Sequence, residues 1–157
     1  MVEIRSAQPA DIDTILEFIH GLAAYERYSG GVEITAEGLT KALFGEESRV
    51  FCEIALSDDS KVGFALWMYT FSTYKGNHGI YLEDIFVRSQ WRGQGIGKAL
   101  LARLASRCIE EDLGRLEWSV LDWNVPAIDF YRSRGAKLLD NLVRCRVDGV
   151  ELVALGG

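Results

Sequence analysis

The segment Arg92-Gly93-Gln94-Gly95-Ile96-Gly97-Lys98 joins a run of β-forming residues to a long amphipathic helical pattern, and it decides how the chain is interpreted. Glycines in such a loop let backbone N–H groups approach an anion closely. The helix that follows adds a partial positive charge at its N-terminus. A flexible turn before a helix is the simpler alternative. We favour the anion-binding interpretation.

Two familiar phosphate loops do not fit this segment. A P-loop would need glycine at position 92 and Ser or Thr at position 99, where the chain has Arg92 and Ala99. The dinucleotide fingerprint would need a third glycine at position 98, where Lys98 stands, and an early βαβ unit. The loop therefore indicates a phosphate-bearing ligand other than ATP or NAD.

Hydrophobic periodicity on both sides of the loop predicts alternating helices and strands. Strands are expected over residues 2–5, 50–56, 62–71, 80–87 and 116–121, and helices over 9–27, 35–45, 96–109 and 126–134. The dipeptide Asp148-Gly149 is typical of a tight hairpin turn, so it predicts two final strands, the second over 150–155. The order β-α-α-β-β-β-α-β-α-β-β predicts a mixed α/β (α+β) sheet with helices on its faces.

The length and composition of the chain fit one globular domain over residues 1–157. Apolar residues make up 48% of the chain and charged residues 25%, and no linker or repeat divides it. The net charge of -6 argues against a nucleic-acid partner, because proteins that bind phosphate backbones gather positive charge. An acidic protein suits a cationic substrate instead.

Several features predict a cytoplasmic protein without a metal. The chain opens without a signal peptide, and its longest apolar run, residues 64–69, is far shorter than the ~20 residues of a membrane helix. Three scattered cysteines suggest reduced thiols rather than a disulfide framework. His20 and His78 lie too far apart in sequence to suggest a metal site.

The pattern Arg92-x-x-Gly95-x-Gly97 resembles the acetyl-CoA motif of the GNAT superfamily of N-acetyltransferases. Three further segments, residues 24–26 (AYE), 81–87 (YLEDIFV) and 123–136, are similar to diamine (spermidine/spermine) N1-acetyltransferases, a branch that includes enzymes acting on thialysine. The resemblance covers essentially the whole chain. It implies a mixed, mostly antiparallel sheet with a splayed central strand pair, and acetyl-CoA as co-substrate.

The resemblance also implies a set of site residues. Positions expected to hold acetyl-CoA are Ile85, Phe86, Val87, Arg92, Gly93, Gln94, Gly95, Ile96, Gly97, Lys98 and Asn124. Positions expected to contact the acceptor are Tyr25, Glu26, Glu83, Asp84 and Asp140. Catalysis is expected from Glu83 and Tyr131, with direct attack of the bound amine on the thioester and no acyl-enzyme.

The carboxylates Glu83 and Asp84 interrupt a strand, where such residues are unfavourable unless something is gained. Successive strand residues point to opposite faces, so the two act together only if a bulge redirects one. Otherwise they are solvated charges on an edge strand, an alternative that suits Asp84. Acetyl transfer to an amine requires a group that accepts the ammonium proton, because deprotonating an amine of pKa ~10.4 at pH 7 costs roughly 4–5 kcal/mol. The resemblance assigns the proton acceptor to Glu83.

Aromatic residues offer two more candidates. Tyr131 can fill a core, but the resemblance places it beside the thioester sulfur, where a phenol can protonate the leaving thiolate or hydrogen-bond to it. Trp67, Tyr69 and Phe71 alternate along one strand, so they share a face. They can line a channel for a methylene chain or be ordinary core, and we expect core for at least two.

The sequence therefore predicts an acetyl-CoA-dependent N-acetyltransferase whose acceptor is a small cationic amine: a polyamine, a diamine or a thialysine-like amino acid. Two alternatives remain. The same fold can acetylate a protein or peptide amine or an antibiotic, or it can be a non-catalytic acyl-CoA-binding module. The resemblance further implies a homodimer with the apolar end of the chain, residues 150–155, near the subunit interface.

Overall fold

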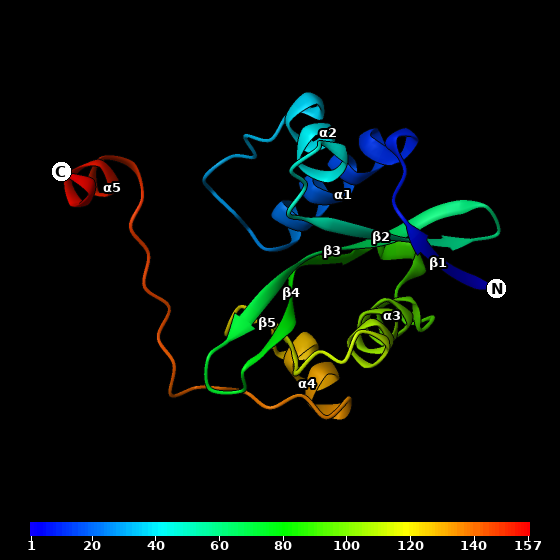
Figure 1. Ribbon diagram of the computed structural model, residues 1–157. Helices are drawn as coiled ribbons and strands as arrows, with labels where there is room; N and C mark the ends of the chain where they lie inside the picture. The colour runs from blue at the N-terminus through cyan, green and yellow to red at the C-terminus, as the bar shows by residue number, and fades with distance from the viewer. The chain divides into compact units, whose positions relative to one another are not determined.

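A five-stranded sheet in the order β1-β2-β3-β4-β5 organises the first part of the chain (Figure 1). The computed structural model describes residues 1–157, which form two compact units, Met1–Ser119 and Val120–Gly157. Neighbouring strands from β1 to β4 are antiparallel, and β4 and β5 are parallel. The strands are β1 (Val2–Ser6), β2 (Phe51–Ser57), β3 (Ser60–Ser72), β4 (Asn77–Val87) and β5 (Leu116–Trp118).

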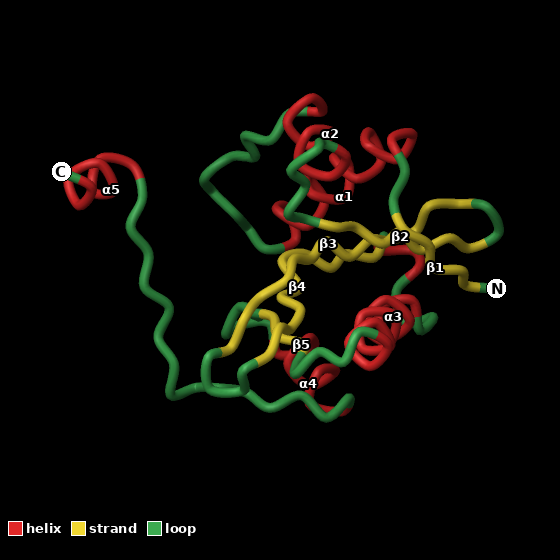
Figure 2. The backbone as a smooth tube through the Cα atoms, in the orientation of Figure 1, coloured by secondary structure: helices red, strands yellow, loops and turns green.

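Helices cover both faces of this sheet, as the sequence predicted. The short turn Pro9–Asp11 leads into α1 (Ile12–Tyr25), which lies with α2 (Ala36–Phe44) on one face, and α3 (Ile96–Glu110) lies on the other (Figure 2). The apolar stripe of α1 packs on the sheet, where the rings of Phe18 and Phe64 stack 5.6 Å apart. Thr35 caps α2, because its side chain accepts a hydrogen bond from the Gly38 amide at 3.0 Å.

The strands β4 and β5 pair only over a short stretch. The ladder joins Ile80–Leu82 to Leu116–Trp118, and β4 then continues to Val87 after β5 has ended. The fifth predicted strand, residues 116–121, is therefore shorter than expected. The prediction of a splayed strand pair in a mostly antiparallel mixed sheet is confirmed.

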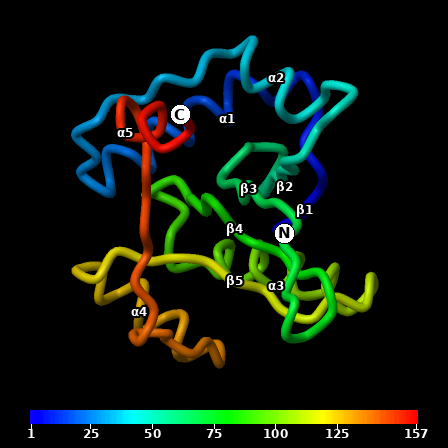
Figure 3. Tube along the Cα trace, turned by 60° about the vertical axis from the view of Figure 1, so that its left-hand side comes forward, coloured from blue at the N-terminus to red at the C-terminus, as the bar shows by residue number.

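The second unit contains α4 (Val125–Ser133) and α5 (Gly149–Gly156), joined by an extended segment (Figures 2 and 3). The two final strands predicted around Asp148-Gly149 are wrong, because residues 136–148 form no ladder and residues 150–155 are helical. A strand needs a neighbour for its backbone hydrogen bonds, and no strand of this unit supplies one. Apolar side chains there consequently stay in solvent, with Val143 87% and Val150 76% exposed.

None of the helices combines the length and the apolar character that crossing a lipid bilayer requires. Nowhere do three or more His, Cys, Asp or Glu side chains gather in a way that could hold a metal ion. The three cysteines are free thiols.

Candidate functional site

The glycine loop ends at the first turn of α3, and its backbone conformation requires glycine at two positions. Gly93 and Gly95 have φ angles of 77° and 82°, a left-handed conformation that side chains disfavour. Gly95 is the residue before the helix, and its carbonyl accepts the Ala99 amide at 2.9 Å. The amides of residues 96–98 therefore precede the first helical hydrogen bond and remain for a ligand. This arrangement suits a phosphate group.

Arg92 opens the loop and contacts three residues of the first unit, one at the end of α1 and two in β4. Its Nε donates to the Val87 carbonyl at 2.9 Å. Its guanidinium lies 4.9 Å from the ring centre of Tyr25 and 5.4 Å from that of Phe86. These contacts hold the side chain while the two terminal NH2 groups remain for an anionic ligand.

The end of β4 offers backbone groups where the neighbouring strand stops. Along one edge, residues 85–87 pair with residues 63–65 of β3. Their opposite edge lies beyond the end of β5, so alternate N–H and C=O groups there belong to no ladder. This edge suits the amide-rich arm of coenzyme A, which a strand can bind through its backbone whatever its side chains.

A β-bulge occurs at Glu83. Leu82 pairs with Trp67 and Asp84 pairs with Leu66, so Glu83 is an extra residue between two consecutive partners. The bulge meets the condition under which Glu83 and Asp84 can act together. Glu83 is exposed, whereas Asp84 is only partly accessible.

Asp84 is one of three carboxylates, here called the acidic cluster, formed by Glu26, Glu83 and Asp84. Burial, together with the charges of Glu83 and Glu26, raises the pKa of Asp84 to about 6. Burial also raises the pKa of Glu26, which directly follows α1. The interpretation of Asp84 as a solvated surface charge is therefore wrong. Carboxylates that repel one another in this way bind a cation favourably, because its charge offsets their repulsion.

Removing the Asp84 charge is expected to stabilise the ligand-free protein at neutral pH. Its pKa is above the usual 3.8, so this group stabilises the fold while protonated, and that stability is lost as pH rises through about 6. Asp84→Asn should raise the free energy of unfolding at pH 8 by about 1–3 kcal/mol. Urea unfolding at pH 8 and pH 4 measures the change. The gain should nearly vanish at pH 4, and equal gains at both values would contradict this account.

The three alternating aromatic residues of β3 do not form one apolar lining. Trp67 is 1% exposed, stacks on Phe51 at 4.6 Å and is core. Tyr69 is exposed, and its hydroxyl donates to Glu111 at 2.6 Å. Phe71 is exposed beside His78. The expectation that at least two of the three are core is therefore wrong, because only Trp67 is buried.

Three predicted site residues belong to the second unit. Asn124 is buried and begins α4, where its side-chain oxygen accepts the Ala127 amide at 3.4 Å. Tyr131 lies within α4, partly buried beside Phe130, with ring centres 5.5 Å apart. Asp140 is exposed and follows that helix. Asn124 thus sets where the helix that carries Tyr131 begins.

Sequence reasoning missed the contribution of Gly21 and of the Phe86 side chain. A Cβ built on Gly21 would lie 2.8 Å from Cζ of Phe86, so the missing side chain lets α1 approach β4 closely. The sequence did carry an indication of this contact: Gly21 lies inside a predicted helix, where alanine is more favourable by about 1 kcal/mol. Such a glycine points to a close contact.

Comparisons with known proteins point to one family. A family model described as "Acetyltransferase (GNAT) family" matches residues 16–136, across the boundary between the two units. The thialysine N-epsilon-acetyltransferase of Bos taurus is 39% identical over 144 residues, covering 87% of this chain and 84% of the relative. The L-ornithine N5-acetyltransferase of Arabidopsis thaliana is 28% identical over 197 residues, covering 97% and 86%. An integron cassette protein from the mobile metagenome of V. cholerae has a TM-score of 0.80 and 31% identity, covering 99% and 97%.

Proposed function

Because the chain belongs to the GNAT family of acetyltransferases, we propose that it moves the acetyl group of acetyl-CoA to a primary amine of a small cationic acceptor. The acceptor is a polyamine, a diamine or a thialysine-like amino acid. The acidic cluster is the observation that carries this proposal, because a mostly buried carboxylate with a pKa of about 6 favours a cationic partner. Two relatives support it, since their names place the acetyl group on an amine of a basic amino acid.

Acetyl-CoA is bound through the glycine loop and the end of β4 in this proposal. The amides of residues 93–98 and the guanidinium of Arg92 hold the pyrophosphate, and the free edge of residues 85–87 holds the pantetheine arm with Asn124. The left-handed glycines and the parted strands support these assignments. The bound co-substrate supplies a thioester, whose carbonyl carbon is the electrophile.

The acidic cluster then prepares the amine. Glu83 accepts the ammonium proton, directly or through water, while Asp84, Glu26 and Tyr25 hold the acceptor. The neutral nitrogen attacks the thioester carbon, so a C–N bond forms and the C–S bond breaks in a ternary complex. Tyr131 donates a proton to the departing thiolate, and the proton that the attacking nitrogen loses as the amide forms restores the Tyr131 hydroxyl through solvent. The products are an acetamide and coenzyme A with a free thiol.

An amine panel tests the proposal. Purified protein is mixed with acetyl-CoA and spermidine, putrescine, lysine, ornithine or thialysine, and release of free thiol is followed. Release should depend on the added cationic amine, and a neutral hydroxyl analogue such as 1,4-butanediol should give only the background rate.

Calorimetry with coenzyme A and acetyl-CoA separates the ways in which the proposal can fail. Absence of affinity for both ligands would remove the assigned loop function. Tight binding without turnover of any amine would indicate an acyl-CoA-binding module instead. Turnover of a peptide amine or an aminoglycoside, but of none of the small amines, would move the acceptor to another class.

We further propose that residues 1–157 act as one acetyltransferase domain in a cytoplasmic homodimer. The family match across the boundary between the two units supports the single domain. The exposed apolar side chains of Val150, Val153 and Leu155 support association, because contiguous apolar surface generally marks an interface. Light scattering should therefore give twice the 17.5 kDa mass of one chain, and a monomer at assay concentration would contradict the dimer.

A further inference from the structure

We propose that Arg92 couples the acetyl-CoA site to the amine pocket through an arginine clamp formed by Gly21, Tyr25, Phe86 and Arg92. The inference rests on the function proposed above and adds an interdependence between its two sites. Arg92 and Phe86 belong to the co-substrate side, whereas Tyr25 belongs to the acceptor side. The clamp joins residues that the sequence assigned to different ligands.

The guanidinium of Arg92 is held by two rings and one hydrogen bond. Tyr25 comes from the last turn of α1 and Phe86 from β4, with ring centres 4.9 Å and 5.4 Å from the guanidinium carbon. The bond from Nε to the Val87 carbonyl fixes the planar group in contact with both rings. An anion that binds the terminal NH2 groups therefore also fixes the position of the Tyr25 ring.

Gly21 permits this arrangement by letting α1 come close to β4. A side chain at position 21 would meet the Phe86 ring at 2.8, 3.2 and 3.3 Å, so the ring or the helix would have to move. The Phe86 ring also lies 5.9 Å from the buried ring of Phe18. Phe86 is thus confined, and a change at Gly21 reaches Arg92 through this ring.

The end of α1 also carries part of the acidic cluster. Glu26 directly follows Tyr25, and its charge contributes to the raised pKa of Asp84. Fixing Tyr25 against Arg92 therefore also fixes where the Glu26 carboxylate meets the acceptor. Because binding linkage is reciprocal, an amine that orders this end of α1 equally favours coenzyme A binding.

A pair of Tyr25 variants tests the clamp. Tyr25→Phe keeps the ring over Arg92, whereas Tyr25→Leu removes it. Titration calorimetry with coenzyme A should give Tyr25→Phe the wild-type Kd, and Tyr25→Leu a Kd about two- to fivefold higher, the range of a cation–π contact. Equal Kd values for the two variants, each with wild-type circular dichroism, would overturn the coupling.

A matched pair of helix glycines supplies the second test. Gly21→Ala should raise both the Kd for coenzyme A and the KM for the fastest amine of the panel by about threefold or more. In the control Gly38→Ala, the new Cβ meets only the Thr35 hydroxyl at 3.2 Å, and both constants should stay unchanged because α2 is not part of the clamp. A Gly21→Ala protein in which only one constant moves would refute coupling. Failure of the wild type to bind coenzyme A would instead refute the proposed function.

Discussion

Glu83→Gln is expected to lower kcat/KM for the amine by about 10²- to 10⁴-fold, the usual range for loss of a positioned acid or base. Glutamine keeps the size of the side chain at the bulge but cannot accept the ammonium proton. The affinity for acetyl-CoA should stay within about twofold, because the loop and the free edge of β4 are unchanged. Initial rates of thiol release between pH 5 and pH 9 measure the effect. An unaltered pH profile and KM would point to another base.

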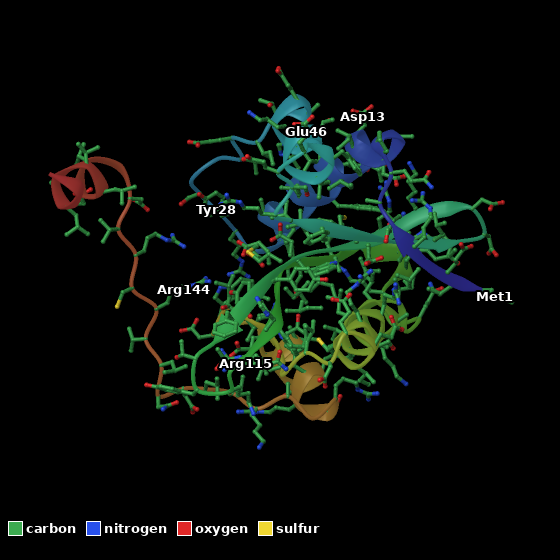
Figure 4. The ribbon with its side chains drawn as sticks, viewed as in Figure 1. Met1, Asp13, Tyr28, Glu46, Arg115 and Arg144 are labelled. Atoms are coloured by element: carbon green, nitrogen blue, oxygen red, sulfur yellow. The ribbon has the colours of Figure 1, made fainter.

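The Asp84→Asn protein separates the roles of the two neighbouring carboxylates. Wild-type kcat/KM should fall below about pH 6, because protonation of Asp84 removes the charge that attracts the amine. Asp84→Asn should remove this fall in rate, whereas Glu83→Gln should keep it but shift it to lower pH, because the charge of Glu83 helps to raise the pKa of Asp84. Glu46→Gln is a suitable control, because this exposed residue lies beyond α2 and outside the acidic cluster (Figure 4). If Asp84→Asn instead abolishes turnover while Glu83→Gln is mild, the two residues exchange roles.

Tyr131→Phe is expected to lower kcat by about 10²-fold with little change in acetyl-CoA affinity. The thiolate would then leave without a positioned proton donor. Phenylalanine preserves the ring that packs beside Phe130 on α4, so the helix should stay intact. Steady-state thiol release gives kcat, and calorimetry with acetyl-CoA gives the affinity.

Tyr74→Phe is the matched control for that experiment, because Tyr74 is fully exposed in the turn between β3 and β4. It loses the same hydroxyl and should keep wild-type rates. Equal turnover in Tyr131→Phe would remove Tyr131 from the mechanism. A rise in the Kd for acetyl-CoA that matches the loss in kcat would assign it a binding role instead.

The parts of the fold that depend on local signals were predictable from the sequence. The spacing of apolar residues located α1 and α3, and Thr35 marked the start of α2. The glycines of the loop marked the left-handed positions 93 and 95. These features are encoded within a few neighbouring residues, so a single sequence contains the information.

Features that depend on distant residues were not predictable. The bulge at Glu83 is fixed by the register between β3 and β4, which places Asp84 opposite Leu66. Strand alternation alone separates the two carboxylates onto opposite faces. The stacking of Arg92 on Tyr25 needs the close approach of α1 to β4. The segment around Asp148 has strand-like residues but lacks the neighbouring strand that would make them a ladder.

Because β5 ends early, the sheet of the ligand-free protein has an unpaired strand edge. Residues 85–87 have one edge without a neighbouring strand. In the proposed complex the amide-bearing arm of the co-substrate makes the hydrogen bonds that such a strand would make. Such a ligand contributes to folding by mass action, adding about 2.7 kcal/mol when its concentration is a hundred times its Kd. The lifetime of this enzyme would then follow the metabolic supply of acetyl-CoA, and a starved cell would clear it faster than a fed one.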